Sequence, residues 1–365
     1  MRSPRSTPIK KGAVVSAFAI VLSAVALAAC GSSASGDRFV AGEGKVQAAG
    51  TSATTAAEQP QSSEMAGMTG MTDSQSADAA QYDFEAKPSP ATTKPVQPGP
   101  KTFDLVASEQ RVKVGEKVYD MWTFNNTVPG PALRVVQGDS VTINLKNDGS
   151  SMLPHSVDFH AARINPGTAF KSILPGESIS YTFTAEYPGV FMYHCGTPPV
   201  LQHIGMGMYG MIIVQPKEGF GAPMQEIALV QSELYTSFED MQNNKPDAFA
   251  FNGVPGQYAK EQIQMTGKKP LVRIFFLNAG PSQLSSFHVV GTIFDRVFAD
   301  GNPKNDTYGR QALAVPASGG GVFEMELVED GSYIFVSHQF DQAGKGAVGM
   351  MRVGKDMGTT GAEHS

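Results

Sequence analysis

The sequence predicts an all-β protein whose main body consists of two tandem domains. From residue 101 onward, short segments rich in β-branched and aromatic residues alternate with Gly, Pro, Asn and Asp, as in residues 140–145, 178–183 and 210–214. No long stretch repeats its hydrophobic residues at the 3.6-residue period of a helix. In addition, an internal repeat divides the body into residues 101–217 and 218–355.

The repeat consists of several segments in the same order. Residues 141–147 resemble residues 272–278, and a histidine follows each segment, which places His288 at the position of His155. The last matching strands each begin at a Pro-Gly or Asp-Gly pair. Six residues after that glycine, the first half has Cys195 and the second half has serine. We therefore expect two β-sandwiches or barrels of related structure, of which only the first keeps the cysteine.

The N-terminal 100 residues are typical of a targeting segment followed by a linker. Four basic residues precede a short apolar stretch that ends in Leu-Ala-Ala-Cys at Cys30. This pattern resembles the lipobox of bacterial lipoproteins and predicts a signal peptide over residues 1–29, a lipid on Cys30 and export to a membrane-anchored position in the cell envelope. An ordinary secretory signal is the alternative. Residues 30–100 are predicted to be disordered, and residues 356–365 form a polar tail.

Composition argues against nucleic-acid binding and against a disulfide-rich fold. Lys and Arg number 28 against 34 Asp and Glu, a formal net charge of −6 without a basic stripe, so nucleic acid is not an expected partner. Two cysteines cannot build a disulfide framework. A methionine run in the linker (Met65, Met68 and Met71) offers soft ligands for Cu(I), although an accident of low complexity is the favoured explanation.

Four residues of the first half match the ligands of a blue, type 1 copper centre. Cys195, His203 and Met208 follow the pattern Cys-x7-His-x4-Met, and His155 lies upstream. A thiolate, two imidazoles and a thioether are the ligand set of blue-copper electron-transfer sites. Packing alone does not readily produce all four in this order.

Two more histidines of the first half indicate a second metal. His194 precedes Cys195, and neighbouring residues on a strand point to opposite faces, so His194 is expected to face away from the first centre. His160 follows His155 by five residues. Because catalytic metals typically have three protein ligands, a third must come from elsewhere in the protein, and the second half offers two histidines.

These residues resemble the copper-containing nitrite reductases. The resemblance is carried by residues 152–160, 187–195 and 203–210 of the first half and by residues 286–291 and 335–338 of the second. It covers about residues 101–355. It implies two cupredoxin domains with Greek-key topology, a homotrimer, and reduction of nitrite to nitric oxide with an electron from a small cupredoxin or a cytochrome c.

The resemblance also implies a role for each candidate residue. Type 1 copper would be held by His155, Cys195, His203 and Met208. Type 2 copper would be held by His160 and His194 of one subunit and by His338 of its neighbour. Asp158 and His288 would bind nitrite and deliver protons, a reasonable task for a carboxylate beside an imidazole.

Other interpretations of the same residues stay open. Asp158 could instead orient a ligand histidine, and His288 and His338 could be ordinary histidines of the second half. A laccase-like multicopper oxidase would need about ten imidazoles, whereas the chain has seven histidines and no His-x-His pair. A copper electron-transfer or storage lipoprotein would need only the type 1 centre, which would leave the remaining histidines of both halves unexplained.

Overall fold

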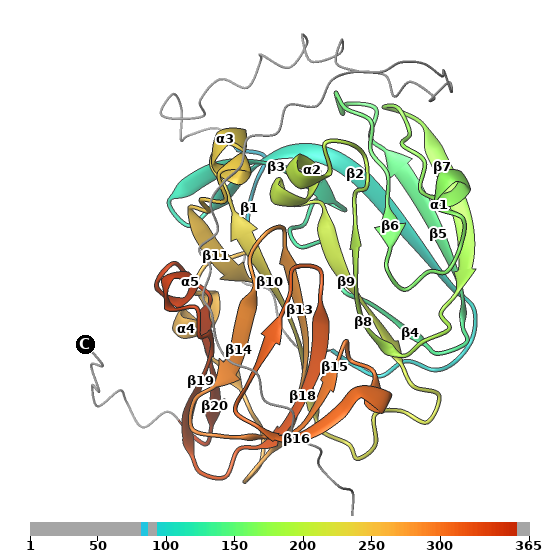
Figure 1. Cartoon of the computed structure of the whole chain (residues 1–365). Coiled ribbons are helices and arrows are strands. Elements are labelled where there is room, and N and C mark those ends of the chain that lie inside the picture. The colour runs from blue at the N-terminus through green and yellow to red at the C-terminus, as the bar shows by residue number, and fades with distance from the viewer. Residues whose placement is uncertain (1–81, 87–92, 356–365) are drawn as a thin grey trace, which may run out of the picture. The chain divides into compact units, whose positions relative to one another are not determined.

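The computed structural model describes residues 82–86 and 93–355. The predicted signal peptide, Cys30, the methionine run and the C-terminal tail lie outside these residues. Strands make up most of the regular secondary structure of the described chain, as predicted (Figure 1), and the helices are short. They are α1 (Pro166–Ala169), α2 (Val200–Gly205), α3 (Phe238–Gln242), α4 (Gln257–Lys260), α5 (Phe340–Gly344) and the 3-10 turn η2 (Pro303–Asn305).

Strands β1 to β9 form two sheets, which we call the N-terminal sheet pair. One sheet has five strands: β1 (Phe84–Glu85), β2 (Lys101–Val114), β3 (Lys117–Phe124), β5 (Ser140–Asn147) and β7 (Ser178–Thr184). The other has four: β4 (Leu133–Val136), β6 (Asp158–Phe159), β8 (Gly189–His194) and β9 (Tyr209–Gln215). In β5, the side chains of Val141, Ile143 and Leu145 are buried while their neighbours are more exposed, the alternation of a strand with one face in a core.

Strands β10 to β20 form the C-terminal sheet pair. The six-stranded sheet contains β10 (Gln225–Leu234), β11 (Ala248–Phe251), β13 (Leu271–Gly280), β15 (Phe294–Ala299), β16 (Asp306–Arg310) and β18 (Gly320–Glu326). The five-stranded sheet contains β12 (Ile263–Gln264), β14 (Ser285–Val289), β17 (Ala312–Val315), β19 (Gly331–Ser337) and β20 (Val348–Val353). Apart from β1, the strands of each described sheet come from only one half of the sequence repeat. The strand β1 lies in the segment predicted to be disordered, where residues 84–85 pair with β2.

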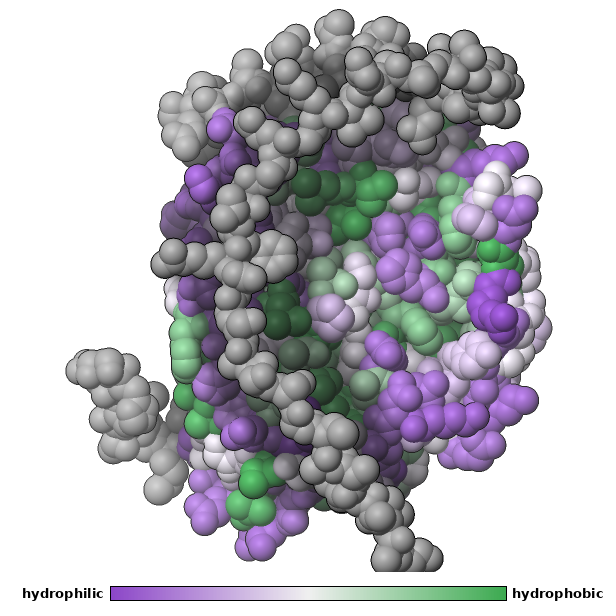
Figure 2. All heavy atoms as spheres, in the orientation of Figure 1, coloured by the Kyte–Doolittle hydropathy of each residue, from purple (hydrophilic) through white to green (hydrophobic). Residues whose placement is uncertain are grey.

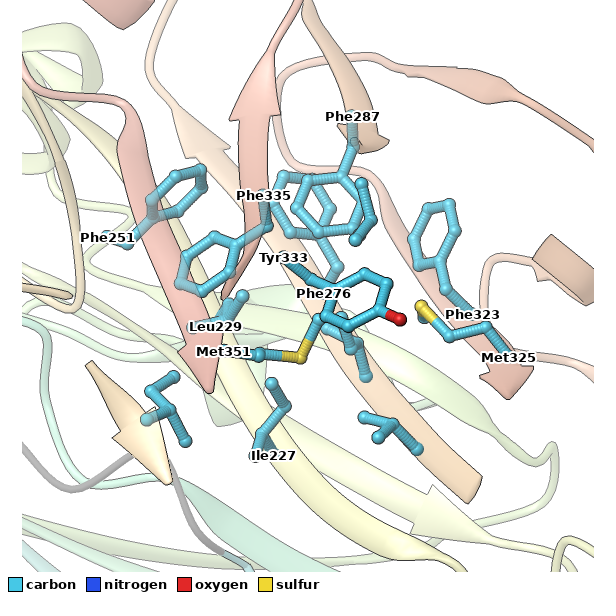
Figure 3. Close-up of a cluster of buried hydrophobic side chains, with 14 of the residues drawn as sticks. Ile227, Leu229, Phe251, Phe276, Phe287, Phe323, Met325, Tyr333, Phe335 and Met351 are labelled. Atoms are coloured by element: carbon cyan, nitrogen blue, oxygen red, sulfur yellow. The ribbon is translucent and has the colours of Figure 1, made fainter. Parts of the chain in front are cut away.

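Aromatic rings fill the core of the C-terminal sheet pair (Figure 3). The rings of Phe276 and Phe287 stack with centroids 4.4 Å apart, and Phe323 lies 4.8 Å from Phe287. On the outside, hydrophilic side chains are interspersed with hydrophobic ones over the face drawn in Figure 2, in keeping with sheets that turn one face to solvent.

The two sheet pairs pack against each other along β8. The backbone N–H of Val190 donates to the carbonyl oxygen of Asp300 at 2.9 Å. Gly320 faces the same strand so closely that a Cβ atom there would lie 2.2 Å from the carbonyl oxygen of Val190. Larger residues at position 320 are thereby excluded. Because β8 ends at His194, this contact fixes the strand that leads into the candidate metal centres.

The strand register corrects one prediction from the sequence repeat. Asp158 pairs with His194 in the ladder of β6 and β8, and His288 pairs with Val336 in the ladder of β14 and β19. His194 and Val336 both immediately precede the matched last position of the repeat. His288 is therefore the structural counterpart of Asp158, not of His155. The sequence comparison was wrong here because the connections before the two histidines differ in length.

Candidate metal centres

The first candidate centre brings together His155, Cys195 and His203. Their donor atoms all lie within 4.8 Å of one another, and all three side chains are buried. Cys195 follows the last residue of β8, His203 lies on α2, and His155 forms an isolated bridge with Ile173. Segments about 40 residues apart in sequence thus meet at one end of the four-stranded sheet.

The His155 ring lies between a thiol and a carboxylate. Its Nδ1 atom is 4.0 Å from Sγ of Cys195, and its Nε2 atom is 3.6 Å from Oε1 of Glu109 on β2. Burial alone would lower the pKa of His155, but contacts with Cys195 and Glu109 raise it above its usual value. No sequence pattern singles out Glu109, which lies 46 residues before His155.

The Cys195 thiol is fully buried and hydrogen-bonded. Burial by itself would raise its pKa, yet the contact with His155, the backbone N–H of Ser156 at 3.3 Å and contacts with Thr197 together lower it. A lowered pKa favours the thiolate, the form of cysteine that binds metals. Cys195 is the one cysteine in the described part of the chain, and it makes no disulfide there.

His203 lies beside this thiol, and Met208 is linked to Cys195 through the backbone. Burial lowers the pKa of His203 to about 4, so its imidazole is neutral near pH 7. The ring of Trp122 packs edge-on against it, with centroids 4.6 Å apart. Met208 is fully buried, and its carbonyl oxygen accepts the backbone N–H of Cys195 at 3.0 Å. A buried thiol together with two imidazoles is a donor set that fits copper.

The second candidate centre contains Asp158, His160 and His194, whose donor atoms also lie within 4.8 Å of one another. The Nε2 atoms of the two imidazoles are 3.0 Å apart. Nδ1 of His194 is 2.9 Å from the carbonyl oxygen of Cys195, to which its N–H can donate a hydrogen bond. Incomplete hydration and the neighbouring His194 lower the pKa of His160, so the neutral ring can offer a nitrogen to a metal.

His288 and His338 form a separate pair on the C-terminal sheets. Their ring centroids are 4.9 Å apart, and the exposed His338 also contacts the ring of Phe340. Nδ1 of His288 lies against the carbonyl oxygen of Gln311. Within the described residues, neither histidine belongs to a cluster of three metal-binding side chains. The structure of one chain thus does not bring His338 to His160 and His194.

The C-terminal sheet pair contains a polar counterpart of the first centre. The backbone N–H of Met208 donates to the carbonyl oxygen of His203, five residues earlier. The backbone N–H of Ala347 donates in the same way to the carbonyl oxygen of Gln342. The backbone N–H of Cys195 donates to the carbonyl oxygen of Met208, and the backbone N–H of Ser337 donates to that of Ala347. Ile173 pairs with His155 as Val315 pairs with Ser285. The counterparts of His155, Cys195, His203 and Met208 are therefore, in this order, Ser285, Ser337, Gln342 and Ala347.

The polar side chains at these counterpart positions take part in a network of hydrogen bonds. The hydroxyl of Ser337 donates to Oε1 of Gln342 at 2.7 Å, and Nε2 of Gln231 donates to the same oxygen at 3.0 Å. Ser285 donates to Oε1 of Gln231 at 2.7 Å. All four side chains are buried. Of these residues, only Ser337 follows from the sequence repeat, as the serine in place of the cysteine.

The all-β fold and the grouping of one cysteine with two histidines define a copper protein of the cupredoxin type. The family profile described as multicopper oxidase matches residues 106–219. The chain belongs to the family of copper-containing nitrite reductases. It is 38% identical over 260 residues to the enzyme of that name from Neisseria gonorrhoeae, an alignment that covers 67% of this chain and 66% of the relative. The chain thus spans about two thirds of the length of this curated relative.

Solved structures of the family have the same fold. The copper nitrite reductase from Nitrosomonas europaea superposes with a TM-score of 0.67 at 39% identity, covering 71% of this chain and 95% of that one. The copper-containing nitrite reductase from Thermus scotoductus gives a TM-score of 0.67 at 36% identity, covering 70% and 62%. In the part of our chain that the structure describes, no helix is long and apolar enough to cross a membrane.

Proposed function

We propose that this protein is a nitrite reductase that converts nitrite, one electron and two protons into nitric oxide and water. One observation carries the proposal. The consecutive residues His194 and Cys195 take part in two different donor clusters, in keeping with neighbouring side chains of a strand pointing to opposite faces. Two metal sites joined by one peptide link suit a reaction that accepts an electron at one site and uses it at another.

The residues at each site follow from this assignment. We assign a type 1 copper to His155, Cys195, His203 and Met208, and a type 2 copper to His160, His194 and a third histidine, His338. When bound, copper supplies one-electron redox chemistry at the first site and Lewis acidity at the second. The lowered pKa values of Cys195 and His203 support this donor set, since a thiolate and a neutral imidazole are the forms that bind a metal.

The chain itself offers the electron two short connections between the sites. The first is covalent, from the side chain of Cys195 through one peptide unit to His194. The second is the hydrogen bond between Nδ1 of His194 and the carbonyl oxygen of Cys195, at 2.9 Å. That bond also fixes the orientation of the ring, which leaves Nε2 directed toward His160.

We assign proton delivery to Asp158 and His288. The Asp158 carboxylate lies within 4.8 Å of the donor nitrogens of His160 and His194, close enough to hold a proton beside a bound substrate. His288 occupies the equivalent position in the other sheet pair, where its ring centroid lies 4.9 Å from that of His338. If His338 is a ligand, His288 would reach the same site alongside it.

The separation of His338 from His160 and His194 supports a site shared between subunits. An exposed apolar residue accompanies His338: the ring of Phe340 contacts it and is 69% exposed. A head-to-tail contact that covers these residues with the N-terminal sheets of a neighbour would bring the three histidines together. Such contacts must close into a ring to avoid filaments, and we propose a homotrimer.

We further propose that the enzyme acts outside the cytoplasm. Its domains would span residues 101–217 and 218–355, and a lipid on Cys30 would anchor them to the cell envelope through the linker. The electron donor would be a small cupredoxin or a cytochrome c that docks near His155 and His203. Mass spectrometry of the native N-terminus tests the anchor: an unmodified Cys30 or a different first residue would refute it.

A copper count combined with a nitric oxide assay tests the central proposal. The purified protein should bind two copper ions per subunit, show an intense blue absorption band, and release nitric oxide when nitrite and a reductant are supplied. A blue protein with one copper and no turnover would instead identify an electron carrier. A colourless protein at full copper loading would exclude the type 1 assignment.

A further inference from the structure

Two glutamates occupy equivalent positions in the two sheet pairs. Oε1 of Glu109 accepts the backbone N–H groups of Met152 and Leu153 at 2.9 and 3.0 Å. Oε1 of Glu233 accepts those of Ser282 and Gln283 at 3.0 and 2.7 Å. In each half these are the third and second residues before the position held by His155 or its counterpart. Both glutamates therefore secure the same turn of the chain.

The two glutamates differ in what else they contact. In the C-terminal sheet pair the histidine position is Ser285, and the second oxygen of Glu233 accepts the hydroxyl of Tyr235 instead. In the N-terminal pair, Oε1 of Glu109 lies 3.6 Å from Nε2 of His155. Securing the turn explains both glutamates, but it does not explain the carboxylate facing this imidazole.

Each nitrogen of the His155 ring faces a polar side chain. Nδ1 faces Sγ of Cys195 at 4.0 Å, so Nε2 is the nitrogen turned away from the cluster. Nε2 is buried and has no hydrogen-bond partner among the described residues, and the Glu109 carboxylate is the acceptor beside it. At 3.6 Å the contact is longer than an ordinary hydrogen bond and acts mainly through charge. The Glu109 side chain is 17% exposed and the His155 side chain 0%, so solvent screens this charge only weakly.

We propose that Glu109 is a positioning residue of the type 1 centre. Its carboxylate keeps the proton of His155 on Nε2, which leaves Nδ1 as the metal-binding nitrogen, and its negative charge makes the imidazole a stronger electron donor. Carboxylates that accept from a ligand histidine orient the ring and raise its basicity. Both effects favour oxidised over reduced copper and lower the reduction potential. This inference rests on the proposed function.

Matched variants of the two glutamates test the proposal in the copper-loaded full chain. Glu109→Gln keeps an oxygen for the two backbone N–H groups but removes the charge, and Glu233→Gln makes the same change where no imidazole is present. We expect Glu109→Gln to shift the equilibrium toward reduced copper about tenfold, which is about 59 mV for a one-electron couple, and to alter the blue band. Glu233→Gln should leave the potential and the band unchanged.

Two outcomes would overturn the proposal. An unchanged potential in Glu109→Gln would mean that Glu109 only secures the turn, and an equal shift in both variants would indicate a general effect on the fold. If Glu109→Gln does not fold, Glu109→Asp keeps the charge but withdraws it from His155, and an unchanged potential there would equally overturn the proposal. A wild-type protein without a blue band would refute the copper assignment itself, which separates the two failures.

Discussion

His194 and Cys195 are consecutive residues whose side chains face two different clusters. Cys195 lies with His155 and His203, while His194 meets His160 with their Nε2 atoms 3.0 Å apart. The alternation of side chains along an extended strand separates the two clusters, and the peptide link keeps them adjacent.

Replacing the thiol should remove one copper and leave the other. In Cys195→Ser the first site loses its thiolate, so the blue band should disappear and the copper content should fall from two ions to one per subunit. The donors of the second site are untouched. Elemental analysis and absorption spectra of the variant and the wild type measure both effects. Loss of both ions would show that the two sites are not independent.

Removing the proposed proton carriers should slow turnover without releasing metal. General acid–base groups typically contribute 100- to 10,000-fold to a rate, so Asp158→Asn and His288→Ala should each lower nitrite turnover by about 100-fold or more. Copper content should stay at two ions per subunit. If these residues only orient ligands, copper loss will accompany the loss of activity. Full activity in both variants would exclude the proton-relay assignment.

Complementation tests the shared site. A His160→Ala chain and a His338→Ala chain should each be inactive alone. When subunits are mixed and exchanged, some contacts should unite the intact His160 of one chain with the intact His338 of another, and part of the activity should return. The same mixture without exchange is the control. Continued inactivity despite proven exchange would mean that the site lies within one chain.

The polar counterpart of the first centre should stabilise the C-terminal sheet pair. Gln342→Ala would remove the acceptor of both the Ser337 hydroxyl and the Gln231 amide and would open a cavity. Unsatisfied buried polar groups cost roughly 1–3 kcal/mol each, so the free energy of unfolding should fall by about 2–4 kcal/mol in urea denaturation. The control is Gln137→Ala, whose hydrogen bond to Glu186 is exposed and whose effect should stay within about 0.5 kcal/mol. Equal effects in both variants would contradict the role of the network.

The all-β fold class and the grouping of His155, Cys195 and His203 could be predicted from the sequence. Cys195, His203 and Met208 are close in the chain, and the alternation of side chains on a strand is a local property, so the opposite directions of His194 and Cys195 followed as well. The backbone carbonyl oxygen of Met208 accepts the N–H of Cys195, and its role as a ligand stays a prediction. The equivalence of His288 could not be predicted, because it depends on how β14 pairs with β19.

Glu109, Gln231 and Gln342 show what the sequence did not indicate. Each is an ordinary residue of a strand or a short helix, without a motif, and its role depends on partners up to 111 residues away. Amino-acid order and spacing by themselves determined the donor types, the strand pattern and the direction of neighbouring side chains, since covalent geometry fixes these. Only the tertiary structure decided which distant groups surround the donors, because strand pairing and sheet packing set those distances and no local pattern encodes them.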